Sequence, residues 1–472
     1  MANTLGPGDV RVGRLFDGVD DTVPDQAAVL TFDEKHGAEL AIPYYYEQDS
    51  GPNPQYVKTR EWFDMNNGTL PKTLLFEDNK GYVTLTGTMS GGYSGIDRIV
   101  GKVKAQAAIF ERPRSYKDEY LVREFISNID GLREFARFSP VQHEQERGEN
   151  GRYRTTVVLD ANECVDWESG GFKYAIQSNV AWHGTPGRSF VIDDSNPYIS
   201  TVSESGAAIA DHFSAHWAVR VLLSLVFGHK LAWRSHKLRD DAFPLWMMDG
   251  SDRGAHSVEV QMYGTVAQHR DPVPKENTFV FGLFRLDDIG ADGMRKWIEL
   301  YADEVFKQAV QPAAEVINGA SRFLEPQLMM LAISLDRFGY YRFNDKRRRS
   351  MRDHIVKCLE AANLDWPEIG SRIGIAKAIS NVNNDLKHPD RESYPDADVL
   401  AGVKELAEVI ARAQLFDLLG VDDKLRQQFT TGNDVRNAVG IFEHAKLTVT
   451  DEGEFVRGTQ GIPEVATEGN QE

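Results

Sequence analysis

The sequence predicts an α+β protein, in which a β-rich, sandwich-like N-terminal region is followed by an α-helical bundle. Two observations predict the β-rich part: short runs of β-branched, aromatic or aliphatic residues, and the Gly-rich turns between them. The runs fall at residues 29–32, 74–76, 82–86 and 155–159. A third observation predicts the bundle. Beyond Gly290 the apolar residues follow a helical period, and prolines stand at the expected starts and stops.

The 472 residues suffice for several domains, and changes in pattern divide the chain into four segments. Residues 1–202 form the β-rich domain. Residues 203–289 form a helical or mixed connector, in which apolar residues at every fourth position predict a buried helix over 206–227. We expect the bundle over 290–450 and a disordered, acidic tail over 451–472. Bundle helices are expected at about 292–317, with a kink at Pro312, and at about 325–340, 346–362, 366–388, 399–419 and near Asn433.

Composition excludes several classes of protein. Acidic residues outnumber basic ones 71 to 53, which excludes binding of nucleic acid through bulk positive charge but permits a local basic patch. The two cysteines, Cys164 and Cys358, exclude a disulfide framework and a zinc site built on several thiolates. The N-terminus lacks a signal peptide's apolar run, and the most apolar stretch, 217–227, is far shorter than the ~20 residues that span a bilayer. We therefore expect a cytoplasmic protein with no membrane partner.

The segment 371–395 carries the most informative pattern. At ~100° per residue, one stripe of the predicted helix holds apolar residues that should face the bundle core: Ile375, Ile379, Val382 and Leu386. A second stripe, on roughly the opposite side, is polar: Asn381, Asn384, Asp385 and His388. Pro389 ends the helix and leaves Lys387, His388 and Arg391 together. Two interpretations stay open, a polar site with a titratable imidazole and cations, or a frayed helix end where His and Lys offset the dipole.

A multi-helix bundle that carries Asn-Asp-x-Lys-His-Pro-x-Arg at 384–391, behind a β-rich region, resembles the ApeA-like branch of the HEPN superfamily with its ApeA-type N-terminal domain. The resemblance is sharpest over 381–391, extends over 290–445, and is diffuse over the N-terminal region. It implies a prokaryotic abortive-infection ribonuclease, an antiviral toxin that hydrolyses RNA without a metal or other cofactor. It also implies tRNA as substrate, cut in the anticodon loop, activation by a phage-encoded trigger protein sensed through the N-terminal region, and a homodimer or higher homo-oligomer.

The family motif is an Arg, a polar residue, a few further residues and a His. Matched to this sequence, the polar residue is Asn384 or Asp385, and the His is His388. The position expected to hold Arg is Asn383, and the nearest upstream Arg is Arg372. Either Lys387 or Arg391 supplies the cation, or the bundle is a non-catalytic module that binds nucleotide or RNA or only dimerises.

Metal-free RNA cleavage needs a base for the ribose 2′-OH proton, a cation for the phosphorane oxygens and a route to protonate the leaving oxygen. His388 suits proton transfer near neutral pH. Lys387 and Arg391 are suited to stabilise the phosphate, and Asn384 and Asp385 to orient the imidazole or the sugar.

The densest basic run spans 344–352 and is expected to open a helix. Its cations are candidates for contact with RNA phosphates: Lys346, Arg347, Arg348, Arg349 and Arg352. Equally, they could lie on a solvated helix face and pair with neighbouring carboxylates. His212 and His216 have the i,i+4 spacing of two metal ligands, but the adjacent Glu of HExxH is absent, so we favour ordinary core or surface histidines and expect no metal site.

Overall fold

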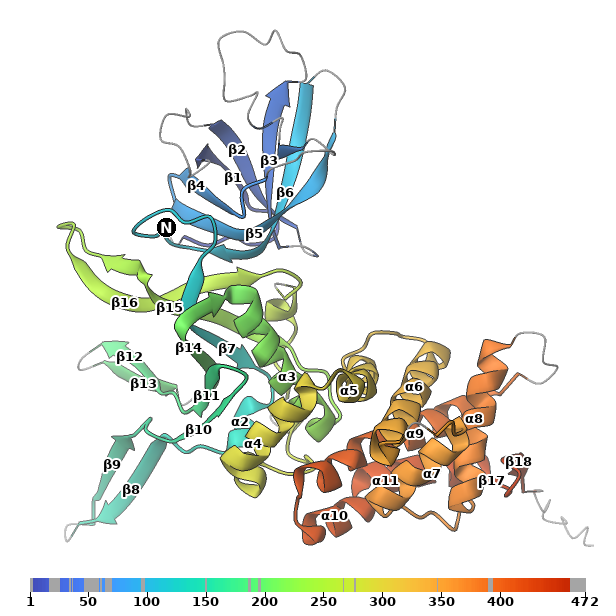
Figure 1. Ribbon diagram of the computed structural model, residues 1–472. Helices are drawn as coiled ribbons and strands as arrows, with labels where there is room; N and C mark the ends of the chain where they lie inside the picture. Colours follow the sequence, from blue (N-terminus) through green and yellow to red (C-terminus); the bar gives the residue numbers. More distant parts are fainter. Residues whose placement is uncertain are drawn as a thin grey trace, which may run out of the picture. The chain divides into compact units, whose positions relative to one another are not determined.

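In a computed structural model the chain forms two compact units (Figure 1). The β-sheet unit comprises residues 1–223, 231–281 and 285–299, and the helical unit comprises 224–230, 282–284 and 300–472. The structure describes residues 3–16, 26–33, 35, 37–45, 59, 62–63, 70–94, 98–148, 151–185, 188–193, 197–265, 267–275, 277–345, 347–388 and 394–458. The predicted fold class is confirmed, since a β-rich N-terminal region precedes a helical C-terminal region.

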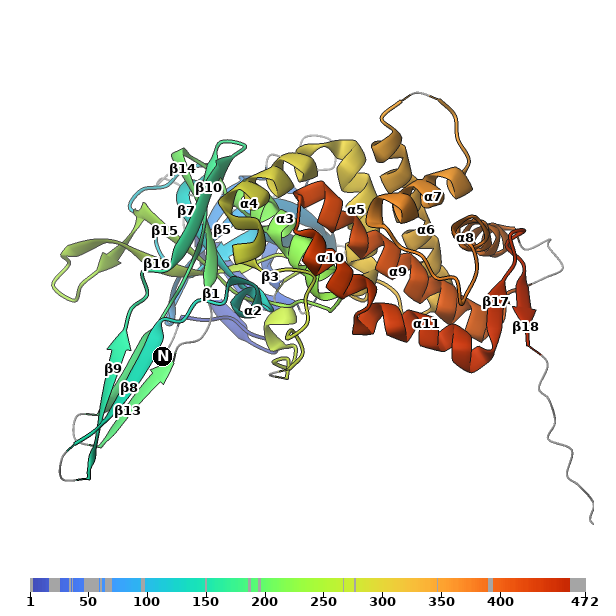
Figure 2. The ribbon, with the colours of Figure 1, turned by 90° about the horizontal axis from the view of Figure 1, so that it is seen from below.

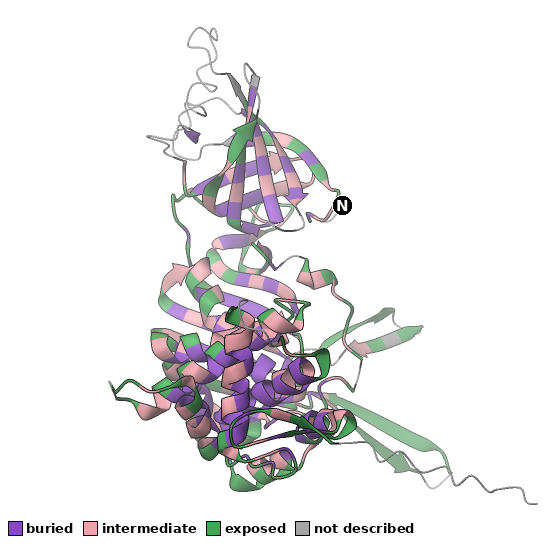
Figure 3. Ribbon diagram, turned by 90° about the vertical axis from the view of Figure 1, so that its right-hand side faces the viewer, coloured by how far each residue is buried: buried purple, intermediate pink, exposed green. Residues whose placement is uncertain are grey.

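Six antiparallel strands of the β-sheet unit close on themselves. They are β1 (Val10–Phe16), β2 (Gln26–Asp33), β3 (Gly37–Tyr45), β4 (Thr73–Asp78), β5 (Gly81–Ser94) and β6 (Arg98–Ile109). Their order is β6-β3-β2-β1-β4-β5, and β5 pairs again with β6, so these strands present no open edge between them. Alternate side chains of β2 point inward, and Figure 3 shows buried residues recurring along these strands. We call this element the closed sheet.

The open sheet continues from β6. Its strands are β7 (Leu121–Ile129), β10 (Cys164–Ser169), β11 (Phe172–Gln177), β14 (Tyr198–Ala208), β15 (Trp233–Trp246) and β16 (Asp252–Met262), in the order β10-β11-β14-β7-β15-β16. Pairs from Val260↔Ile109 to Met262↔Ala107 join β16 to β6. Two separate hairpins belong to the same unit, β8 (Val141–Arg147) with β9 (Tyr153–Leu159) and β12 (Ala181–Thr185) with β13 (Ser189–Asp193).

The segment predicted to be a connector, 203–289, supplies strands of the open sheet, and this differs from the prediction. Strand β15 pairs with β7 and β16, and β16 pairs with β15 and β6. Only alternate residues of β16 are buried, and charged residues such as Arg239 and Asp240 interrupt β15. The apolar runs that mark a strand in sequence are therefore absent here.

Helix α3 (Ile209–Phe227) lies on the open sheet, close to the range predicted for a buried helix. His212 Nε2 lies 3.0 Å from the carbonyl oxygen of Val122 in β7, and His212 Nδ1 lies 2.8 Å from the hydroxyl of Thr201 in β14. Short segments complete the unit, namely α2 (Leu132–Ala136), a 3-10 turn η1 (Gln268–Arg270) and most of α4 (Leu286–Ala302). The ends of α3 and α4 belong to the helical unit.

The helical unit is built around α9. Its elements are α5 (Glu304–Ile317), α6 (Leu324–Phe343), α7 (Met351–Ala362), α8 (Arg372–Lys387), α9 (Ala397–Leu419), α10 (Asp423–Thr430), α11 (Asn433–Ala445), β17 (Leu447–Val449) and β18 (Phe455–Arg457). Every residue of α9 from 406 to 416 is buried, and α9 contacts α5, α6, α7, α8, α10 and α11 (Figure 2). A helix that is buried all round marks the centre of a bundle.

Three predicted helices begin elsewhere. The helix expected over 366–388 begins at Arg372, where Ser371 caps it. The helix expected over 292–317 is two helices, because Asp303 accepts hydrogen bonds from the backbone N–H groups of Val305 and Phe306 and so caps α5, which continues through Pro312. The helix expected from residue 346 begins at Met351. There Ser350 and Asp353 form a reciprocal capping box, so most of the basic run precedes the helix and Arg352 lies in its first turn.

Part of the segment predicted to be a disordered tail is folded. Strands β17 and β18 form a hairpin against α8, and Val449 N–H donates to Ile369 O at 2.7 Å. This close approach requires glycine at positions 370 and 374, because a Cβ on Gly370 or Gly374 would meet the backbone of residues 449–450 at 2.5 Å or less. These glycines lie far from the hairpin in sequence, and no local pattern reveals the contact. Residues 459–472 of the predicted tail lie outside the described residues.

Candidate functional site

The polar stripe predicted on α8 is present at the end of that helix. Ser371 caps its N-terminus by accepting a hydrogen bond from Gly374 N–H at 3.1 Å. The apolar stripe is buried at Ile375, Ile379 and Val382, whereas the polar stripe is half-buried at Asn381, Asn384 and Asp385. Lys387 and His388 are exposed, and His388 N–H donates to Asn384 O at 3.0 Å. Four predicted site residues are thus brought to one helix end: Asn384, Asp385, Lys387 and His388. The fifth, Arg391, lies outside the described residues.

A groove of about 450 Å³ runs beside this helix end. Residues of α8, of the chain entering α9 and of the turn of the β17–β18 hairpin line it. The lining residues are Asn381, Val382, Asp385, Tyr394, Pro395, Val399, Gly453, Glu454 and Phe455. Tyr394 is 65% exposed, and its hydroxyl donates to Glu325 Oε1 at 2.9 Å, which raises the pKa of the phenol. The groove therefore combines two aromatic rings with two carboxylates.

Asn383, at the position where the family motif has Arg, does not share this face. It is 1% exposed, and its Nδ2 lies 3.6 Å from Met351 Sδ on α7. Its Oδ1 is buried with no hydrogen-bond partner among the described residues. The sequence holds a signal for this burial, because Asn383 stands four residues after the core residue Ile379.

Arg372 is at the opposite end of α8 from His388, and 16 residues of helix span roughly 24 Å. Its Nε donates to Leu364 O at 2.7 Å. It is therefore no substitute for the motif Arg. Among the described residues near His388, Lys387 is the cation that α8 itself supplies.

The basic run lies partly in ion pairs. Arg349 Nη2 donates to Asp345 Oδ2 at 2.8 Å, and Arg352 Nη2 donates to Asp353 Oδ1 at 2.8 Å. These hydrogen bonds lower the pKa values of both carboxyl groups. Two of the predicted RNA-binding cations are thus paired.

Arg347 and Arg348 are exposed, and neither guanidinium has an ion-pair partner within the described ranges. Lys346 lies outside those ranges. The contact between Met351 and Asn383 brings the end of the basic run against α8. Two guanidinium groups without an ion-pair partner therefore stand a few residues before the start of α7, where Met351 contacts α8.

His212 and His216, with the spacing of metal ligands, are fully buried core residues instead. Both rings lie within 3.0 Å of the Thr201 hydroxyl, and His216 Nδ1 lies 2.8 Å from Ser127 Oγ. Burial holds the pKa values of both imidazoles below their ordinary value, and that of His216 well below it. Across the described part of the chain, no group of three or more His, Cys, Asp or Glu side chains is placed to hold a metal ion.

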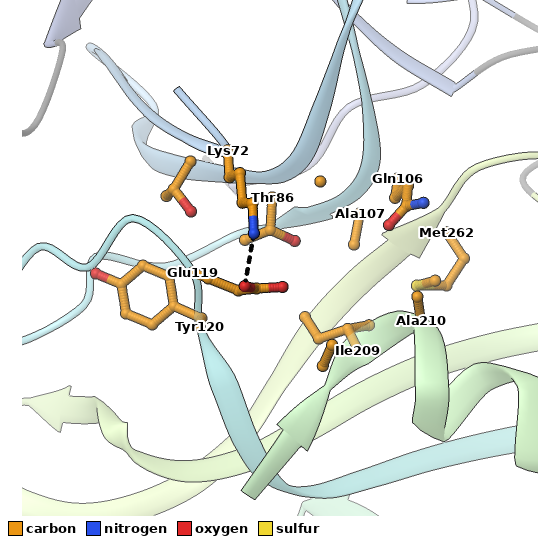
Figure 4. A pocket seen from close by; sticks show the side chains of 12 residues that line it. Lys72, Thr86, Gln106, Ala107, Glu119, Tyr120, Ile209, Ala210 and Met262 are labelled. Atoms are coloured by element: carbon orange, nitrogen blue, oxygen red, sulfur yellow. Dashed lines mark hydrogen bonds and ion pairs between the residues drawn. The ribbon is translucent and has the colours of Figure 1, made fainter. Parts of the chain in front are cut away.

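The β-sheet unit also contains a small cavity of about 50 Å³ (Figure 4). Lys72 Nζ and Glu119 Oε2, which form an ion pair at 2.9 Å, lie on its border, together with Tyr120 and Met262. No helix among the described residues has both the length and the apolar character to cross a membrane.

The fold and the site define a class of two-part proteins, in which a β-sheet unit precedes a helical unit that carries a polar site at one helix end. Residues 15–297 match the family model described as ApeA N-terminal domain 1, and this is more than half of the chain. The protein therefore belongs to the ApeA N-terminal domain 1 family, and the predicted ApeA-type N-terminal domain is confirmed. Neither a curated protein nor a solved structure matches the chain.

Proposed function

We propose that this protein is an anti-phage abortive-infection effector whose helical unit is a metal-independent endoribonuclease of the HEPN type. The observation that carries the proposal is the arrangement at the end of α8, where the exposed His388 follows Asn384, Asp385 and Lys387 within one helical turn. The family membership of residues 15–297 supports a defence role. Arg347 and Arg348 supply local positive charge in an otherwise acidic chain.

In the proposed reaction, His388 accepts the proton of a ribose 2′-OH, and the 2′ oxygen attacks the adjacent phosphorus. The P–O5′ bond breaks, the leaving 5′ oxygen takes a proton from water, and the hydroxide so formed takes the proton from the His388 imidazolium, which restores the base. The products are a 2′,3′-cyclic phosphate and a 5′-hydroxyl end. Lys387 stabilises the charge that develops on the phosphorane oxygens. Asn384 and Asp385 orient the imidazole or the sugar.

The proposed substrate is tRNA, cut in the anticodon loop, where unpaired nucleotides leave the 2′-OH free to align for attack. Such an enzyme acts in the cytoplasm, where tRNA is found. The β-sheet unit would restrain the nuclease until a phage-encoded trigger protein binds one of its states more tightly. Pairing of two chains would bring two copies of His388 together.

The second candidate is a non-catalytic module that binds RNA or nucleotide, or only dimerises. It is favoured by Asn383, since the position expected for the motif Arg holds a buried amide beside Met351. Lys387 is then a surface residue with no catalytic role. Binding of RNA without cleavage distinguishes this candidate from the nuclease.

The test is inducible expression of wild type, His388→Ala and His444→Ala in bacteria, with and without phage, followed by sequencing of small-RNA ends. His444 is a matched control, because it is also an exposed histidine at the C-terminal end of a helix of the same unit. We expect new tRNA ends with wild type and His444→Ala, and none with His388→Ala. Full toxicity of His388→Ala, or intact RNA and equal phage growth with wild type, would contradict the proposal.

A further inference from the structure

The groove beside α8 has a lining that does not suit phosphate. Among the described residues that line it, the charged ones are Asp385 and Glu454, and none is Lys or Arg. A phosphate placed there would be repelled by like charge. Hydrogen-bond donors, by contrast, would find acceptor oxygens. The remaining surface is apolar or aromatic, from Val382, Val399 and Phe455 among others.

The Glu454 carboxylate is available to such a donor. The residue is exposed, and its side chain has no hydrogen-bond or ion-pair partner among the described residues. Its backbone, by contrast, is held on both sides, since Glu454 N–H donates to Thr450 Oγ1 at 3.2 Å and Thr450 N–H donates to Glu454 O at 3.0 Å. An acceptor on a fixed backbone is pre-organised for a ligand.

The hairpin turn is held against α8 by further contacts. Lys377 on α8 pairs with Glu452, and Ser371 bonds to Asp451. Gly453 is buried with φ +76°, and a Cβ there would lie 2.8 Å from Ala378 N. The turn that carries Glu454 therefore lies directly on the helix that carries the polar stripe.

Aromatic walls and carboxylate acceptors are the chemistry that recognises an unpaired nucleobase, by stacking and by hydrogen bonds to its Watson–Crick edge. Among the four RNA bases, guanine presents two adjacent N–H donors on that edge, at N1 and at the N2 amino group. One carboxylate accepts both at once, in the same bidentate manner in which it accepts from Arg. Adenine and cytosine each offer an acceptor beside their donor, which a carboxylate repels.

We propose that this groove binds a guanine base of the RNA, with Glu454 accepting from N1–H and N2–H and the base lying against Tyr394 or Phe455. Asp385 precedes His388 by three residues, a rise of about 4.5 Å along a helix. A base in the groove therefore brings its ribose near the imidazole. If the proposed nuclease function is correct, this binding predicts a preference for cutting next to guanosine, and that part of the inference rests on the proposed function. The binding of guanine itself can be measured without cleavage.

The first experiment measures binding of GMP, IMP and AMP to the full chain by calorimetry. IMP keeps N1–H but lacks the N2 amino group, so we expect GMP to bind at least about 10-fold tighter than AMP, with IMP between them. Glu454→Gln should abolish this order, and Glu443→Gln, an exposed glutamate of α11, should preserve it. Equal affinity of the wild-type protein for GMP and AMP would overturn the proposal. This comparison does not depend on whether any variant folds.

The second experiment tests whether the guanine that binds the groove belongs to an RNA or to a free guanine nucleotide. RNA loops that contain guanosine and matched loops with adenosine in its place are bound to wild type, His388→Ala and Glu454→Gln. We expect a guanosine preference in wild type and His388→Ala and its loss in Glu454→Gln. If GMP binds but does not compete with these RNA loops for the protein, the occupant of the groove is not a base of the RNA.

The two proposals fail separately. If wild type cuts RNA with no preference for guanosine and binds GMP no better than AMP, the groove assignment is wrong and the nuclease stands. If the guanine preference in binding is present but no RNA is cut, the groove assignment stands and the nuclease is wrong.

Discussion

Ser127 Oγ and His216 Nδ1 lie 2.8 Å apart in the interior of the β-sheet unit. The direction of this hydrogen bond follows from the Val122 carbonyl group, which starts a chain of hydrogen bonds through His212 and Thr201. His212 Nε2 faces the carbonyl oxygen of Val122 at 3.0 Å, so this nitrogen carries the proton. Burial lowers the pKa of His212 and so keeps its imidazole neutral, which makes Nδ1 an acceptor of a hydrogen bond from the Thr201 hydroxyl, at 2.8 Å. The Thr201 oxygen in turn accepts from His216 Nε2–H, at 3.0 Å.

The donor and acceptor roles of the remaining groups, from His216 to His236, follow in the same way. His216 Nδ1 has no proton and accepts from the Ser127 hydroxyl. Ser127 Oγ then accepts from His236 Nδ1–H, at 2.8 Å. His236 Nε2 is left as a bare acceptor, buried with no partner among the described residues. All three histidines of this network are therefore neutral, each in a single tautomer.

The first prediction is that the β-sheet unit loses stability in acid. Burial lowers the pKa values of His216 and His236 well below 6.5, and burial, together with the Arg234 cation, lowers that of His269 to about 4. The unfolded chain binds more protons than the folded one below pH 6.5. Stability is therefore complete above pH 6.5 and falls as the pH drops toward 4, by up to about 3 kcal/mol for His269.

Urea unfolding at pH 7.5, 6.0 and 5.0, followed by tryptophan fluorescence, measures this loss. Trp233 is a suitable reporter, because its ring centroid lies 5.1 Å from that of His236. Equal midpoints at pH 7.5 and 5.0 would show that these histidines are not buried as described.

The second prediction concerns Thr201, whose hydroxyl serves two imidazoles. Thr201→Val keeps the shape of the side chain but leaves His212 Nδ1 and His216 Nε2 without a partner. We expect the free energy of unfolding to fall by about 2–3 kcal/mol. Thr201→Ser keeps the hydroxyl and should cost about 1 kcal/mol for the lost methyl group. Equal loss in the two variants, by chemical denaturation, would mean that the hydroxyl is not the stabilising group.

Local pattern predicts the helices of this protein better than its sheets. The buried stripe through Ile375, Ile379 and Val382 could be read from spacing, because a helix repeats within a few residues. The pairing of β15 with β7 joins Trp233 to Ile129, more than a hundred residues away, and no local pattern encodes such a register. The polar stripe of the site was therefore predictable, whereas the groove wall supplied by the β17–β18 hairpin was not.

The third prediction concerns Arg412, a buried side chain of α9. Its Nε donates to Leu225 O at 2.8 Å and its Nη2 to Val226 O at 3.1 Å, while Nη1 pairs with Asp434 at 2.7 Å. It thus satisfies carbonyl groups at the end of α3 that have no partner within that helix. Arg412→Met should lower the free energy of unfolding by at least about 2 kcal/mol.

Arg436→Met, at an exposed position of α11, is the control for Arg412 and should change stability by less than about 0.5 kcal/mol. Both variants are compared by denaturant titration of the full chain. A similar midpoint for the two would show that the carbonyl contacts of Arg412 contribute nothing.

The fourth prediction tests the basic run by the salt dependence of RNA binding. Arg347→Gln with Arg348→Gln removes two unpaired cations, so we expect weaker binding and a slope of log K against log salt that is shallower by about 1.4 for single-stranded RNA. Arg349→Gln with Arg352→Gln removes charges already neutralised by Asp345 and Asp353 and should change the slope less. Equal effects of the two pairs would contradict the distinction between paired and free arginines.

The fifth prediction concerns Gly453, which sets how closely the hairpin turn approaches α8. Its φ of +76° costs an L-residue roughly 1–2 kcal/mol, and a Cβ would lie 2.8 Å from the backbone nitrogen of Ala378, which cannot move without disturbing the helix. In Gly453→Ala the turn must therefore leave α8, and the groove loses the wall that carries Glu454. Gly440→Ala is the control, since it lies within α11 with nothing within 4 Å of the added Cβ and should be neutral or stabilise by up to about 1 kcal/mol.

Hydrogen exchange of residues 447–458 follows the turn directly. We expect faster exchange there in Gly453→Ala, with the protection of α9 unchanged, because α9 is buried by the other helices rather than by the hairpin alone. If exchange in the hairpin were the same in both glycine variants, the turn would not depend on close approach to α8. Faster exchange of α9 together with the hairpin would also be inconsistent with a local change, because it would mean that the whole helical unit responds as one.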